Sequence, residues 1–109
     1  MISRSHTWDP PMDIYETDTD LVVRVEIAGM DEKDFSIELK NRQLLITGFR
    51  QEVPERRAYH RMEIRFGEFS ISIELPASIE TDQVLAVYGD GFLKVTMPKS
   101  QPRQILISD

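Results

Sequence analysis

The sequence contains no cysteine and only two histidines. The absence of cysteine excludes disulfides, thiolate nucleophiles and cysteine-based zinc sites, and it agrees with a reducing cytoplasm. Neither His6 nor His60 has the spacing to a second histidine that a metal site would show. Glycine-rich phosphate loops are also missing, because Gly89 and Gly91 flank a turn and lack the lysine and serine of a nucleotide site. We therefore expect no catalytic residue, no metal, no cofactor and no ATP hydrolysis.

Long hydrophobic runs are equally absent, and nothing resembles a signal peptide or a membrane span. The formal net charge of −6 argues against nucleic acid as a partner, since phosphate binding needs a basic stripe. The densest basic stretch, residues 56–65, also contains glutamate and indicates a solvated or ion-paired face. A chain of 109 residues with 40% hydrophobic content is long enough for one domain with its own core. These features favour a cytoplasmic single-domain protein that binds neither nucleic acid nor membranes.

What the sequence does contain is a series of short runs in which apolar and polar residues alternate, as in half-buried strands. In the run 21–28 one face is entirely apolar, and the run that begins at Leu44 alternates up to Gly48. No convincing amphipathic helix lies between these runs. The pattern predicts an all-β fold, an immunoglobulin-like antiparallel β-sandwich. The predicted strands comprise residues 12–14, 21–28, 35–39, 44–47, 69–75, 84–88 and 92–97.

The clearest hairpin is formed by residues 84–97. Its two runs are joined by a Gly-Asp-Gly sequence, in which Asp90 and Gly91 supply the positive-φ residues that a tight hairpin turn needs. The second run has one apolar face and one polar face. The first run is apolar on both faces, because Leu85 and Val87 point away from the face that the other apolar residues share. We therefore expect another segment to cover one of these faces.

The apolar segment left over for this purpose is the tripeptide 105–107, near the C-terminus. As an added strand it would place Ile105 and Ile107 on the same face, two residues apart. We predict that these two side chains fill a groove formed by the first run of the hairpin and a strand beside it. The groove residues we expect are Leu85, Val87, Ile37 and Leu39. Whether the groove belongs to the same chain or to a neighbouring one is left open, and it decides between a monomer and an assembly.

Two motifs in this order resemble a known family. Residues 86–99 resemble the Ala-x-x-x-Asn/Asp-Gly-x-Leu-x-Val-x-x-Pro-Lys signature of the α-crystallin domain of small heat-shock proteins. Residues 105–107 are similar to the C-terminal Ile-x-Ile/Val anchor of that family. Residues 67–76 resemble its Gly-x-Phe-x-Arg-x-Phe-x-Leu-Pro strand, although Ile71 stands where an arginine is common. The resemblance implies a short N-terminal arm (1–8), an α-crystallin β-sandwich domain (9–99) and a C-terminal extension with the Ile-x-Ile anchor (100–109).

A fourth motif concerns dimer formation. Tyr59, His60, Arg61 and Met62 resemble the Tyr-His-Arg segment that, in the bacterial, archaeal and plant branch of the family, crosses to the neighbouring subunit and pairs with its sheet. Such an exchange would add backbone hydrogen bonds to the exposed edge of the partner's sheet. The resemblance therefore implies a homodimer that is built by strand exchange and that can assemble into a higher homo-oligomer.

The function implied by the resemblance is that of an ATP-independent holdase, a chaperone that binds partly unfolded client proteins and prevents their aggregation under stress. Two alternatives stay open. One is a p23/CS-like co-chaperone adaptor, which docks on a larger chaperone and shares the sandwich but lacks the exchanged segment and the Ile-x-Ile tail. The other is a plain sandwich dimer with little holdase activity, in which residues 105–107 form the last strand of the chain's own sheet.

Overall fold

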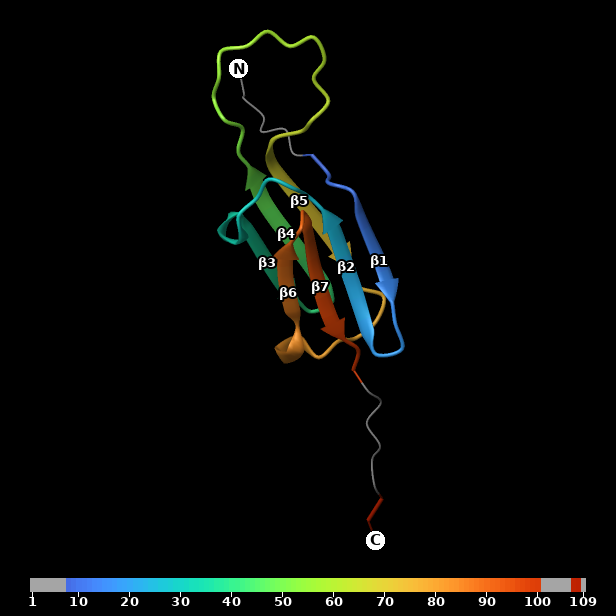
Figure 1. Ribbon diagram of the computed structural model, residues 1–109. Helices are drawn as coiled ribbons and strands as arrows, with labels where there is room; N and C mark the ends of the chain where they lie inside the picture. The colour runs from blue at the N-terminus through green and yellow to red at the C-terminus, as the bar shows by residue number, and fades with distance from the viewer. Residues whose placement is uncertain (1–7, 101–106, 109) are drawn as a thin grey trace, which may run out of the picture.

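The fold is an all-β sandwich of two antiparallel sheets, which confirms the predicted fold class (Figure 1). The computed structural model describes residues 8–100 and 107–108. Two single-turn 3₁₀ helices connect strands within the described ranges. The elements are β1 (Met12–Glu16), β2 (Asp20–Glu26), η1 (Glu32–Asp34), β3 (Phe35–Lys40), β4 (Gln43–Arg50), β5 (Gly67–Glu74), η2 (Thr81–Gln83), β6 (Leu85–Gly89) and β7 (Phe92–Pro98).

The two sheets have four and three strands. The four-stranded sheet has the order β1-β2-β7-β6, and the three-stranded sheet has the order β3-β4-β5. Within the described residues, β1 and β6 are therefore the open edges of the first sheet, and β3 is an open edge of the second. The other edge strand of the second sheet, β5, is bridged by Trp8 at Phe69. Strands β3 and β6 lie on the same side of the sandwich, and β1 lies on the opposite side (Figure 1). Each open edge presents backbone groups that can pair with another chain.

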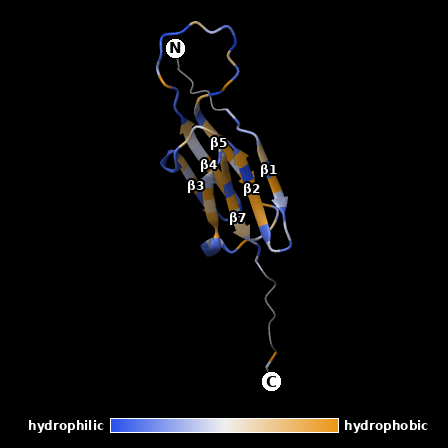
Figure 2. Ribbon diagram, viewed as in Figure 1, coloured by the Kyte–Doolittle hydropathy of each residue, from blue (hydrophilic) through white to orange (hydrophobic). Residues whose placement is uncertain are grey.

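The core lies between the sheets and contains the apolar residues that alternate along each strand. Figure 2 shows these residues on the strands, whereas the turns and the long connection between β4 and β5 are mainly hydrophilic. Phe69 is fully buried, and its ring meets the rings of Trp8 and Phe35 edge-on at centroid distances of 5.8 and 6.1 Å. The other fully buried large side chains are Leu21, Ile27, Leu44, Ile46, Leu75, Met97, Val23, Val25 and Val95.

The predicted hairpin is confirmed as β6 and β7. Asp90 and Gly91 have φ angles of 53° and 80°, which are the positive values that a two-residue hairpin turn requires. The register pairs Leu85 with Thr96 and Val87 with Lys94 across the hairpin. The β-branched and aromatic residues of the two runs and the Asp-Gly sequence between them therefore predicted the hairpin and its turn correctly.

The end of β4 lies three residues beyond the predicted one. Alternation stops at Gly48, where a strand end is expected from sequence, but β4 continues through Gly48 to Arg50. Gly48 lies between Phe35 of β3 and Phe69 of β5 in the register of the sheet. The ring of Phe69 lies so close that a Cβ atom added at Gly48 would be 2.5 Å from its Cζ atom. Glycine is accommodated in this strand because an aromatic ring occupies the space of its missing side chain.

Residues 51–66 connect β4 to β5 without forming a strand in the single chain. They arch beyond the end of the sandwich, away from both sheets (Figure 1). The ladder between β4 and β5 ends at the pair formed by Arg50 and Gly67, so the connection leaves and re-enters the sheet at neighbouring positions. No helix within residues 8–100 and 107–108 has the length and apolar character needed to cross a membrane.

Candidate functional site

A groove of about 400 Å³ separates the edge strands β3 and β6. Of the predicted groove residues, the structure brings Ile37 and Val87 together in its lining, whereas Leu39 and Leu85 lie on the same two strands outside that lining. The sequence predicts that Ile37 and Leu39 lie on a strand beside β6. Strand β3 is not a hydrogen-bonded neighbour of β6, and it faces β6 from the other sheet. The residues that line the groove are Glu32, Phe35, Ile37, Ala86, Val87, Tyr88 and Leu93.

The orientation of β6 is set by Tyr88. Its hydroxyl donates a hydrogen bond to the carbonyl oxygen of Ile27 at 2.8 Å and accepts one from the backbone N–H of Met30 at 3.3 Å. With Tyr88 directed inward, alternation directs Leu85 and Val87 outward, and these side chains are 61% and 54% exposed. Among the described residues, strand β6 is therefore an open edge, with apolar side chains beside backbone groups that pair with no other strand.

The predicted anchor lies only partly within the described residues. Ile107 is 94% exposed, so its apolar side chain makes almost no contact with the sandwich. Ile105 lies outside the described residues. The seating of Ile105 and Ile107 in the groove therefore stays a prediction.

The 51–66 segment carries the second cluster of exposed apolar side chains. Tyr59 and Met62, both predicted from the sequence motif, are exposed, as are Val53 and Ile64. His60 is also exposed and belongs to the same segment. The sequence motif did not include Ile64. This residue lies two positions after Met62, and two residues with this spacing share one face of a strand.

Polar contacts hold part of this segment in shape. The Tyr59 hydroxyl donates a short hydrogen bond to the Glu52 carboxylate, which raises the pKa of Tyr59 above its ordinary value. Arg57 lies 3.5 Å from the same carboxylate, donates to the carbonyl oxygen of Val53 at 2.7 Å and stacks 5.5 Å from the Tyr59 ring. Arg61 pairs with a glutamate two residues further on at 3.6 Å. The predicted reading of this basic stretch as an ion-paired face is thereby confirmed for Arg57 and Arg61.

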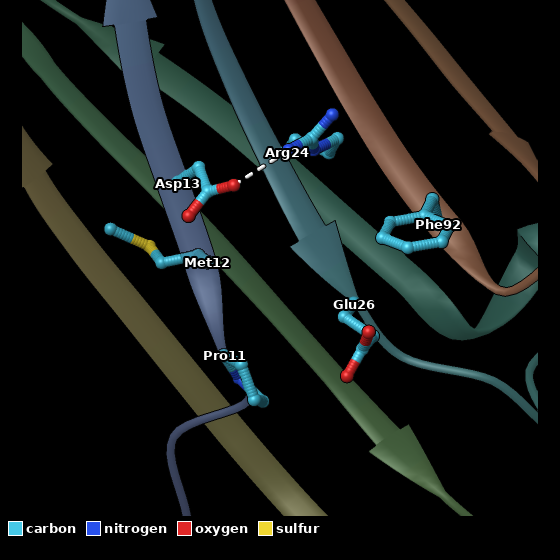
Figure 3. Close-up of a pocket in the computed structure, with 6 residues that line it drawn as sticks. All are labelled: Pro11, Met12, Asp13, Arg24, Glu26 and Phe92. Atoms are coloured by element: carbon cyan, nitrogen blue, oxygen red, sulfur yellow. Dashed lines mark hydrogen bonds and ion pairs between the residues drawn. The ribbon is translucent and has the colours of Figure 1, made fainter.

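The open edge β1 presents a mixed apolar and charged surface. Arg24 donates a hydrogen bond to the Asp13 carboxylate at 2.7 Å, and this contact raises the pKa of Arg24 (Figure 3). The guanidinium also lies 5.7 Å from the Tyr15 ring and 5.9 Å from the Phe92 ring. Next to this pair is a hollow of about 340 Å³, which Met12 and Phe92 help to line. Ile14, on the face of β1 opposite to that of Asp13, is 41% exposed.

The Hsp20/alpha crystallin family matches residues 13–108, which is nearly the whole chain. The chain belongs to this family. Small heat shock proteins are non-enzymatic chaperones that typically act as holdases, and the family is known to form oligomers. The predicted resemblance to small heat shock proteins is therefore confirmed at the level of the family.

Individual small heat shock proteins agree with this assignment. Small heat shock protein C2 of Rickettsia felis is 38% identical over 94 residues, which cover 84% of this chain and 61% of that protein. A probable 15 kDa heat shock protein of Leptospira interrogans is 32% identical over 93 residues, covering 85% of this chain and 72% of the relative. The chain thus spans less than two thirds of the length of the first relative and less than three quarters of the second.

Solved structures show the same sandwich. Heat shock protein 16.0 of Schizosaccharomyces pombe superimposes with a TM-score of 0.76 at 29% identity, over 93% of this chain and 99% of that one. A small heat-shock protein of Xylella fastidiosa, for which a distinct high order structure is described, gives a TM-score of 0.78 at 28% identity, over 95% and 100% of the two chains.

Proposed function

We propose that this chain is an ATP-independent holdase that captures partly unfolded clients in the cytoplasm and prevents their aggregation under stress. The observation that carries this proposal is the gathering of exposed apolar side chains at the open strand edges and on the 51–66 segment of a protein from a chaperone family. An extended client segment could pair with the backbone of such an edge while its side chains cover the apolar ones. Binding of this kind needs no nucleotide.

Assembly would mask this surface in the absence of stress. We propose a homodimer in which the 51–66 segment of each subunit, with Tyr59, His60, Arg61 and Met62 at its centre, pairs with the β1 edge of the other. Two features support this exchange: the segment forms no strand in its own chain, and β1 has an unpaired side.

The C-terminal extension would link dimers into a higher homo-oligomer. We propose that Ile105 and Ile107 enter the opening between β3 and β6, where Leu85, Val87, Ile37 and Leu39 would surround them. Each isoleucine that becomes fully buried contributes about 1.5–3 kcal/mol, so two of them hold the extension only loosely. Modest heating or a competing client segment would then release the extension and expose the β6 edge.

The holdase proposal is tested by light scattering from a heat-aggregating client protein, with this chain added over a range of molar ratios. We expect scattering to be suppressed at about one subunit per client, without ATP and to the same extent with it. A p23/CS-like adaptor would give no protection without its larger chaperone. An assembly-only dimer would stay folded and give no protection under any condition, and a reproducible ATP effect would contradict passive binding.

Replacement of both Ile105 and Ile107 by alanine is expected to reduce any higher oligomer to dimers. The reason is that each substitution removes most of the apolar surface by which the extension would be held. Multi-angle light scattering measures the mass. Leu106→Ala is the matched control, because an extended backbone directs that side chain to the opposite face. An unchanged mass in the double variant would mean that the extension does not link subunits.

A further inference from the structure

Arg50, the last residue of β4, joins four segments of the chain at the root of the 51–66 segment. Its Nε and Nη2 atoms both donate hydrogen bonds to the carbonyl oxygen of Arg65, the former at 2.9 Å. Its Nη1 atom donates to the carbonyl oxygen of Ala28, in the connection between β2 and β3, at 3.3 Å. Its guanidinium lies 4.5 Å from the centre of the Trp8 ring and 5.2 Å from that of the Phe66 ring.

The Trp8 ring that contacts Arg50 is itself fixed to the sandwich. The indole Nε1 donates a hydrogen bond to the carbonyl oxygen of Gly67 at 3.3 Å. The backbone N–H of Trp8 donates one to the carbonyl oxygen of Glu68, also at 3.3 Å. Trp8 is also buried against Phe69. Arg50 therefore connects the outgoing end of the 51–66 segment to its returning end, and its guanidinium rests against a buried ring.

We propose that Arg50 is a positioning residue that clamps the two ends of the 51–66 segment and fixes the direction in which this segment leaves the sandwich. A planar guanidinium is suited to this role because its in-plane N–H groups reach two carbonyl oxygens while its faces contact aromatic rings. A lysine at this position would supply a single ammonium group without the planar fork. The clamp lies directly beyond the Arg50–Gly67 pair, where the ladder between β4 and β5 ends.

The effect of the clamp on assembly rests on the proposed strand exchange. A segment whose ends are already held loses less conformational freedom when it pairs with a partner than a segment with free ends does. Loss of the clamp is therefore expected to raise the dimer dissociation constant by about tenfold. The clamp itself is measured separately, at a protein concentration at which sedimentation shows the monomer, so that the comparison does not depend on exchange.

Arg42 provides a matched control at the other end of the three-stranded sheet. Its Nε and Nη2 atoms donate to one carbonyl oxygen, that of Leu75, at 3.1 and 2.9 Å, in the same forked geometry as Arg50. Arg42 lies in the turn between β3 and β4, away from the 51–66 segment. Arg42→Gln thus removes an equivalent fork from the same sheet without touching the segment.

The experiment compares Arg50→Gln with Arg42→Gln by native-state digestion with trypsin, counting only cleavage after Arg56, Arg57 and Arg61. Arg50→Gln is expected to increase the cleavage rate about tenfold. Without the contacts of Arg50, the two ends of the segment would separate more often, and the segment would more often adopt the extended conformation that the protease binds. The fluorescence of Trp8, the single tryptophan, should shift to longer wavelength in the same variant. Arg42→Gln should change neither the cleavage rate in the segment nor the fluorescence. If Arg50→Gln unfolds the chain, Arg50→Lys, which keeps the charge and the stem, takes its place.

Sedimentation of the same variants then measures the dimer. A weaker dimer in the Arg50 variant, with an unchanged one in the Arg42 variant, supports the positioning role. Equal cleavage rates in wild type and the Arg50 variant, or an equal increase in the Arg42 variant, would overturn the clamp. A monomeric wild type would contradict the strand exchange instead, and the cleavage comparison would still decide the clamp.

Discussion

Gly48→Ala is expected to destabilise the sandwich by about 1–3 kcal/mol, although it adds a single methyl group to a strand. A Cβ atom at this position would lie 2.5 Å from Cζ and 2.7 Å from Cε2 of Phe69, and 3.0 Å from the carbonyl oxygen of Asp34. The ring of Phe69 is fully buried between the rings of Trp8 and Phe35, so it cannot turn aside without displacing them. The expected loss comes from overpacking and not from a strained backbone, because Gly48 is not among the residues with positive φ.

Urea unfolding, followed by the fluorescence of Trp8, measures this loss at a fixed protein concentration. Gly89→Ala is the matched control, because a Cβ atom at Gly89 would have no atom within 4 Å, and alanine there should be neutral or slightly stabilising. Phe69→Leu removes the atoms that collide with the new methyl group. The combination of Gly48→Ala with Phe69→Leu should therefore be less destabilised than the sum of the two single changes. Additive losses would show that the collision is not the cause.

Deletion of residues 53–62 is expected to convert the proposed dimer into a monomer that keeps its fold. The deletion removes Tyr59 and Met62, and with them most of the apolar surface that would pair with the β1 edge of a partner. Six residues would remain between Arg50 and Gly67, which are directly opposite each other in the ladder. A hairpin loop of that length closes readily, and the Arg50 contacts at its root would be retained.

Sedimentation measures the mass of the deletion variant, and circular dichroism checks its strand content. Leu85→Ser combined with Val87→Ser is the control, since it removes exposed apolar surface from the β6 edge on the other side of the sandwich. That control should keep the dimer and weaken only the assembly of dimers. A dimer that persists after the deletion would locate the interface at another surface, with β6 as the remaining open edge of the larger sheet.

Alternation along the chain was enough to predict most of the strands, because the side-chain period of two depends only on the local backbone and on burial of one face. Strand β6 is the exception, since its run is apolar on both faces and was predicted from its residue types and the turn that follows it. The turn at Asp90 and Gly91 was predictable for the same reason, since its positive φ angles select these residue types locally. The extent of β4 was not predictable. Glycine within a strand normally indicates a break, and only the approach of the Phe69 ring from β5 explains why the strand continues through Gly48.

The sequence by itself determined the fold class, the family and the residues that carry exposed apolar side chains, such as Leu85, Val87 and Met62. These follow from local periodicity and from motifs whose residues are close together in the chain. Only the tertiary structure decided that β3 and β6 face each other from different sheets, and that Arg50 joins Trp8, Ala28 and the residues before β5. Strand order and such contacts depend on pairings between distant segments, which leave no periodic signal in the sequence.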